Sequence, residues 1–68
     1  MKLDKRKLDI IRAKRKIGVN WLAKKAGVGG STIYAGYERN IDPVSIGRIA
    51  MALEVNVEDI ITNEDWEA

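Results

Sequence analysis

Residues 19–38 read VNWLAKKAGVGGSTIYAGYE, and this segment holds four of the six glycines in the chain. Its first part has apolar residues at positions 19, 22, 23 and 26, the spacing of a helix with one buried face. Gly27 follows where a left-handed helix cap is expected. Ile33 and Tyr37 are four residues apart and can share the buried face of a second helix. The segment therefore predicts two helices joined by a tight turn.

Three further helices are predicted around this pair. One covers about Asp4 to Lys16, with an apolar stripe that includes Leu8, Ile10 and Ile11. Another begins at Asp42-Pro43, an N-cap residue followed by proline at the first helical position. Its apolar stripe consists of Ile46, Ile49, Ala50 and Leu53. Asn56 caps a last short helix, whose inward residues are Val57, Ile60 and Ile61. The sequence thus predicts an all-α, compact five-helix domain with a central helix-turn-helix at about residues 19–38.

Composition narrows the class of protein. A chain of 68 residues makes one domain, expected over residues 1–61, and the acidic tail 62–68 is expected to be flexible. The absence of cysteine and histidine excludes disulfides, zinc sites, Cys nucleophiles and Ser-His pairs. We therefore expect no cofactor, no metal site and no catalytic residues. No apolar run has the length of a membrane span, and no signal peptide is apparent, so a cytoplasmic protein is expected.

The charges are divided unevenly along the chain. Residues 1–40 contain eleven Lys and Arg and three Asp and Glu, a net charge of +8, whereas residues 41–68 contain one Arg and seven acidic residues, a net charge of −6. A basic half beside an acidic half indicates one side that faces a polyanion and one that faces away. Solvated helix faces that merely differ in sign would explain the division equally well.

The ordered apolar and turn residues resemble the phage repressor and Cro type of helix-turn-helix domain. The resemblance covers about residues 8–61 and rests on Leu22-Ala23, Ala26-Gly27-Val28, Ser31-Thr32-Ile33, Glu38-Arg39, Pro43, Ile49-Ala50, Ala52-Leu53 and Val55. It implies a five-helix DNA-binding domain, usually dimeric, that controls transcription.

Three features depart from the pattern of that family. Gly18 and Val19 replace the usual Ser or Thr cap and the Gln that grips a phosphate. The third helix begins with Gly29-Gly30 rather than with Ser-Arg or Ser-Gln. The chain between Gly27 and Glu38 is one residue longer than is common, and we place the extra residue near Gly36.

The candidate base-reading residues are small. The first two turns of the third helix hold no Arg, Lys, Asn or Gln, the usual specific readers of guanine and adenine. Ser and Thr can bond to several bases, an Ala or Thr methyl group can touch the methyl group of thymine, and glycine permits close approach. The candidates for base-edge contacts are Gly30, Ser31, Thr32, Tyr34 and Ala35. The two glycines would be equally suited to a purely structural cap.

Polar residues at the ends of the two central helices are the candidates for phosphate contacts. They are Lys16, Asn20, Arg39 and Asn40, of which Arg39 and Asn40 follow the recognition helix where the family usually touches phosphates. Trp21 lies off the apolar stripe of its helix. It could cover the edge of the core or bring its indole N–H near a phosphate, and the first role is favoured.

The resemblance also implies an ion pair and a dimer. A matching Arg and Glu pair in the family, so we expect a partly buried ion pair between Arg12 and Glu38. Apolar residues near the C-terminus, Ile60, Ile61 and Trp66, are the candidates for a dimer contact. A homodimer would match a two-fold symmetric double-stranded operator.

Two functions from different classes remain open. The first is a sequence-specific, repressor-like DNA-binding regulator of transcription from a bacterium, a phage or a mobile element. The second is a protein-binding helix-turn-helix module, an antirepressor or antitoxin-like partner. The weak set of base readers favours the second function, and the basic half with Arg39 favours the first. An enzyme is a distant third, because no acid–base pair, metal cluster or phosphate loop is present.

Overall fold

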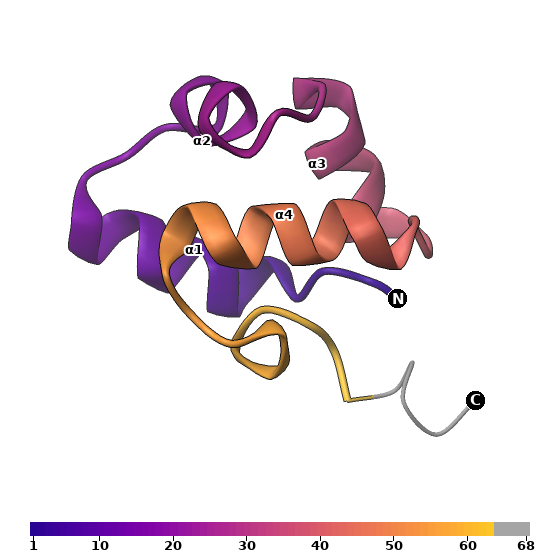
Figure 1. Cartoon of the computed structure of the whole chain (residues 1–68). Helices are drawn as coiled ribbons and strands as arrows, with labels where there is room; N and C mark the ends of the chain where they lie inside the picture. Colours follow the sequence, from indigo (N-terminus) through magenta and orange to yellow (C-terminus); the bar gives the residue numbers. More distant parts are fainter. Residues whose placement is uncertain (64–68) are drawn as a thin grey trace.

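The computed structural model describes residues 1–63 and is all-α. Its elements are α1 (Lys5–Arg15), α2 (Val19–Ala26), α3 (Gly30–Glu38), α4 (Pro43–Leu53) and a single 3-10 turn, η1 (Val57–Asp59). In Figure 1, α4 crosses the middle of the molecule, α2 and α3 lie above it, and η1 lies below. No helix within residues 1–63 has the length and apolar character needed to cross a bilayer.

The core is built around α4. Its predicted stripe is confirmed, because Ile46, Ile49, Ala50 and Leu53 are all buried. The other buried apolar residues are Leu3, Leu8, Val19, Leu22, Ala23, Ile33, Ile60 and Ile61. All four helices contribute to this one cluster and Val57 of η1 packs against it, so the helix-turn-helix pair is fixed by the same core as the rest of the domain.

The N-terminal helix α1 buries less than its sequence predicts. Asp4 caps it, and the Asp4 carboxylate accepts a 3.1 Å hydrogen bond from the backbone N–H of Lys7. Leu8 is buried and Ile11 is partly buried, but Ile10 is 47% exposed. The predicted apolar stripe of this helix was therefore too broad.

The predicted fifth helix is a 3-10 turn, so the count of five helices is not confirmed. Asn56 caps it as expected, in a capping box with Asp59. After Ile60 the chain extends along the N-terminal segment, where the Thr62 N–H donates to the carbonyl of Lys2 at 3.0 Å and Leu3 forms an isolated antiparallel bridge with Ile61. These bonds use backbone groups that a longer helix would have needed for itself.

The first residues of the chain make contacts within the fold that the sequence did not indicate. Leu3 is 1% exposed, and its N–H donates to the carbonyl of Gly36 in α3 at 2.8 Å. The N–H of Ile41 donates to the carbonyl of Met1 at 2.7 Å, and the N–H of Asp4 donates to the carbonyl of Ile60 at 2.8 Å. This segment therefore ties the end of α3 to the C-terminal part of the described chain.

Gly36 is needed for that close approach. A Cβ atom built on Gly36 would lie 2.7 Å from Cδ1 of Leu3 and 3.0 Å from Cδ1 of Ile41. Helix α3 continues through this position to Glu38. Gly36, the predicted place of the extra residue, is thus a buried contact between α3 and the N-terminal segment.

Candidate nucleic-acid interface

The turn between α2 and α3 has the predicted geometry. Gly27 has a φ of +75°, in the left-handed region that favours glycine. The N–H groups of Gly27 and Val28 donate to the carbonyl of Ala23 at 2.9 and 3.0 Å, closing the end of α2. Val28 is partly buried against the core. The turn therefore packs α2 and α3 against each other at a fixed angle.

Backbone donors are available at the start of α3. Its N-cap, Gly29, has an extended backbone and no side chain with which to cap the helix. Within the described chain, the N–H groups of Gly30 and Ser31 have no acceptor. Free N–H groups and the positive end of the helix dipole at such a place suit a phosphate.

The outer face of α3 carries the predicted base-edge candidates. Ser31 is exposed and Tyr34 is 58% exposed, while Gly30, Thr32 and Ala35 are half-buried. Ile33 and Gly36 face inward. The helix thus presents a narrow polar and aromatic strip whose backbone a ligand could approach closely.

Polar side chains flank both ends of α3. Asn20, on the first turn of α2, is exposed, and its Oδ1 lies 3.9 Å from the position that a Cβ on Gly30 would occupy. Arg39 and Asn40 are exposed at the other end, where the N–H of Arg39 donates to the carbonyl of Ala35 at 2.9 Å. Lys16 is exposed between α1 and α2. Asn20 therefore lies near the start of the strip and Arg39 and Asn40 follow its end, whereas Lys16 belongs to the connection between α1 and α2.

Comparison with known families decides what this arrangement is. The family model of the Cro/C1-type helix-turn-helix DNA-binding domain matches residues 7–65. The chain belongs to this family. A search of the curated proteins and a search of the solved structures each gave no match. As a Cro/C1-type domain the protein binds double-stranded DNA, and its role is regulatory.

The ion pair expected in this Cro/C1-type domain is replaced by another. Arg12 donates to Oδ1 of Asp9 at 2.9 Å and to the carbonyl of Ile17 at 3.3 Å, rather than to Glu38. Glu38 is exposed, and no ion pair to it is formed among residues 1–63. Asp9 lies three residues before Arg12 on the same helix, so its carboxylate meets the guanidinium without crossing to α3.

Asp9 also pairs with Lys5, whose Nζ atom lies 2.6 Å from Oδ2 of Asp9. Hydrogen bonds from Lys5 and then from Arg12 lower the pKa of the Asp9 carboxyl group. Nearby, burial raises the pKa of the Tyr37 hydroxyl group. This cluster was not predicted, although the i, i+4 spacing of Lys5 and Asp9 was a signal for it.

Trp21 covers less of the core than was predicted. It is 50% exposed on α2 and borders a shallow hollow with Lys24 and Lys25. An exposed aromatic ring beside two lysines suits a polyanion, which favours the second role considered for this residue, a phosphate contact by the indole N–H.

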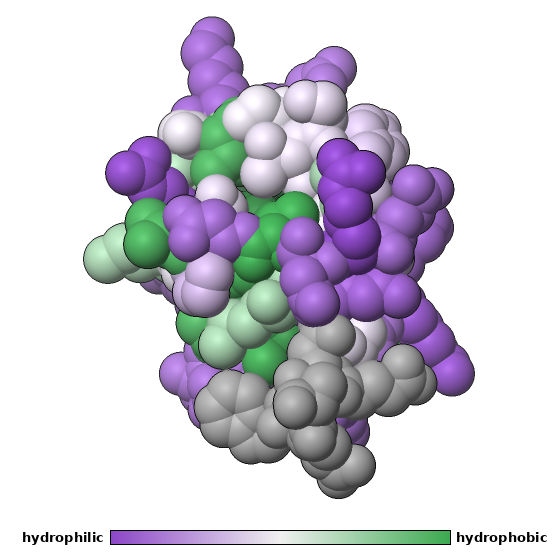
Figure 2. Space-filling model, turned by 90° about the vertical axis from the view of Figure 1, so that its right-hand side faces the viewer, coloured by the Kyte–Doolittle hydropathy of each residue, from purple (hydrophilic) through white to green (hydrophobic). Residues whose placement is uncertain are grey.

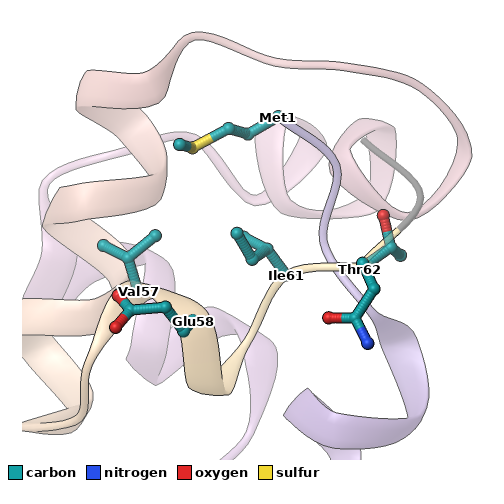
Figure 3. A pocket seen from close by; sticks show the side chains of 6 residues that line it. Met1, Val57, Glu58, Ile61 and Thr62 are labelled. Atoms are coloured by element: carbon teal, nitrogen blue, oxygen red, sulfur yellow. The ribbon is translucent and has the colours of Figure 1, made fainter. Parts of the chain in front are cut away.

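The predicted dimer residues Ile60 and Ile61 are buried, so they offer less surface for a contact than expected. Ile60 and Ile61 are 0% and 5% exposed, because both side chains complete the core. Trp66 lies outside the described residues. Ile61 does line a hollow of about 450 Å³ (Figure 3). The other residues that line it are Met1, Val57, Glu58, Thr62 and Asn63. Figure 2, viewed from the end where α3 leads into α4, shows apolar side chains gathered in the middle of that face.

Proposed function

We propose that the protein is a sequence-specific, repressor-like regulator of transcription in the cytoplasm of a bacterium, encoded by its genome, a phage or a mobile element. Helix α3 enters the major groove, which is wide enough to admit an α-helix. The exposed strip of Ser31 and Tyr34, with candidate phosphate-binding side chains at both ends of the helix, is the observation that supports this assignment.

The base contacts are proposed to be few and the phosphate contacts strong. Ser31 and Thr32 supply hydroxyl groups, Tyr34 supplies a ring edge and a hydroxyl group, and Gly30 and Ala35 keep the helix close to the bases. Lys16, Asn20, Arg39 and Asn40 contact phosphates on either side. Because phosphate contacts do not depend on sequence, affinity rests mainly on them and discrimination on the strip.

Two copies of the chain are proposed to bind a two-fold symmetric operator. The proposed contact is the hollow lined by Met1, Val57 and Ile61 (Figure 3). Met1 ties it to the connection between α3 and α4, because the N–H of Ile41 donates to the carbonyl of Met1 at 2.7 Å. Val44, 59% exposed, follows that connection on the first turn of α4. Association there would place two α3 helices side by side, as half-sites about 10 base pairs apart require.

Selection from a pool of random DNA duplexes tests the proposal. The wild-type protein is expected to enrich one sequence, and that duplex and a shuffled duplex then serve for titrations at several salt concentrations. Arg39→Ala should weaken binding to both duplexes and make the slope of log K against log salt shallower by about one unit. Ser31→Ala and Tyr34→Ala should instead narrow the difference between the duplexes with little change in slope.

The same experiment separates this function from a protein-binding role. If no sequence is enriched, the protein does not read sequence. If no duplex binds at low salt, it does not bind DNA by itself, and capture of a protein partner becomes the better account.

A further inference from the structure

Two tyrosines of α3 pack against each other. The ring centroids of Tyr34 and Tyr37 are 6.1 Å apart, and the ring planes meet at 80°, an edge-to-face arrangement. Tyr34 is 58% exposed on the proposed DNA-facing strip, whereas Tyr37 is packed against the core and its hydroxyl oxygen is buried. Tyr37 therefore restricts the orientations open to the exposed ring.

Helix α1 holds Tyr37 from the other side. The Nζ atom of Lys5 lies 5.8 Å from the centroid of the Tyr37 ring, within the range of a cation–π contact. A lysine on a helix surface would ordinarily sample several rotamers. Here Lys5 is bound to Oδ2 of Asp9 at 2.6 Å, and Asp9 is itself bound to Arg12 at 2.9 Å. The ammonium group is thus held above the ring by a carboxylate on its own helix.

We infer that Lys5 and Asp9 are positioning residues for sequence reading, which they influence through the stacked pair Tyr37 and Tyr34. The inference rests on the proposed function, because it assumes that Tyr34 meets the bases. Ordering a side chain before binding removes part of the entropic cost of the contact. Only the duplex whose bases fit the fixed Tyr34 ring is bound more tightly as a result. The ratio of affinities between the selected and the shuffled duplex therefore changes more than the general affinity for DNA.

Lys5 has one other possible role, a direct contact with a phosphate. The two roles differ in a measurable way. A lost phosphate contact weakens binding to every duplex and makes the salt slope shallower by about one unit. A lost positioning contact narrows the ratio of affinities between the selected and the shuffled duplex and leaves the slope unchanged.

The test measures that ratio, by anisotropy titration, for variants of the full chain against the duplex that the wild type selects and its shuffled counterpart. Lys5→Met is expected to narrow the ratio of affinities about 3-fold at an unchanged salt slope. Lys5→Arg keeps a cation above the ring and is expected to keep the ratio of the wild type. Lys14→Met removes an exposed lysine of the same helix and should leave the ratio as in the wild type.

Tyr37 provides an independent set of variants. Tyr37→Phe keeps the ring and should retain the ratio, whereas Tyr37→Leu should narrow it about 3- to 10-fold. Asp9→Asn should narrow the ratio as Lys5→Met does, because Lys5 then loses the carboxylate that holds it. Melting curves show which variants remain folded at the temperature of the titration.

The results that overturn the inference are distinct from those that overturn the proposed function. An unchanged ratio for Lys5→Met, or an equal loss on both duplexes with a shallower slope, shows that Lys5 positions nothing. If the wild type binds no duplex, the proposed function fails first, and there is then no base reading for Lys5 and Asp9 to support.

Discussion

At the scale of single residues, two glycines in helices have opposite surroundings. A Cβ on Gly36 would meet Leu3 at 2.7 Å, whereas a Cβ on Gly47 in α4 would have no heavy atom within 4 Å. Gly36→Ala should therefore lower the free energy of unfolding by about 1–3 kcal/mol through overpacking. Gly47→Ala should raise it by about 0.5–1 kcal/mol, because alanine favours the helix. Urea denaturation of both variants checks the difference, and a neutral Gly36→Ala would contradict the contact with Leu3.

A second prediction concerns a strained backbone position. Glu54 ends α4 with a φ of +57°, in the left-handed region that costs a residue with a side chain about 1 kcal/mol or more. Glu54→Gly should raise the free energy of unfolding by about 0.5–1 kcal/mol, or the melting temperature by a few degrees. Lys25→Gly, an exposed position within α2, should lower both. If the two variants shift the melting temperature in the same direction, the cap geometry at Glu54 is wrong.

At the scale of elements, α1 is stabilised by its own ion pairs rather than by a pair with α3. The pKa of Asp9 is lowered in the folded protein by Lys5 and then by Arg12. A lowered folded pKa means that the stabilisation is present above the ordinary pKa of 3.8 and is lost as the pH falls through the folded value. Asp9→Asn should therefore cost about 0.5–1 kcal/mol at pH 7, and this cost should shrink toward zero near pH 2.

Denaturation curves at pH 7, 4 and 2 check this dependence. Glu38→Gln is the control, because Glu38 is an exposed carboxylate with no ion pair in residues 1–63, and it should unfold like the wild type. A large loss of unfolding free energy in Glu38→Gln would contradict this account and support the ion pair with Arg12 that the resemblance implied.

The elements show what the sequence could and could not predict. The spacing of apolar residues and the position of Gly27 predicted α2, the turn and the inner face of α4, because these depend on local periodicity and on one backbone conformation. Leu3 and Gly36 are far apart in the chain, and no local pattern shows that they touch. Arg12 had two acidic residues as candidate partners, and it pairs with Asp9 and not with Glu38. Which carboxylate it meets depends on the distance between α1 and α3, which no local pattern gives.

For the candidate site, the sequence predicted where the side chains lie better than which DNA groups they contact. Ser31, Tyr34, Asn20 and Arg39 are exposed around α3 as a DNA contact requires. Their individual contacts stay predictions, because the small side chains of α3 fit several bases. The pair of Tyr37 with Lys5 was not predicted, since it joins two helices that only the fold brings together.

At the scale of the whole molecule, two copies are expected to associate through the hollow lined by Met1, Val57 and Ile61. Val44→Glu should place a charge on the exposed first turn of α4, next to the chain connection that Met1 contacts, and reduce the protein to a monomer in sedimentation experiments. Met51→Glu, also on α4 and 80% exposed, is the matched control and should leave the assembly unchanged. A wild type that remains a monomer at high concentration, with and without DNA, would contradict the dimer.

The central claim is that α3 reads DNA from the major groove, and chemical protection of the bases tests it most directly. Dimethyl sulfate methylates guanine at N7, which lies in the major groove, and adenine at N3, which lies in the minor groove. On the duplex selected by the wild type, the protein should protect guanine N7 in two half-sites about 10 base pairs apart and leave adenine N3 reactive. Protection of adenine N3 alone, or no protection of a duplex that is fully bound, would contradict the account.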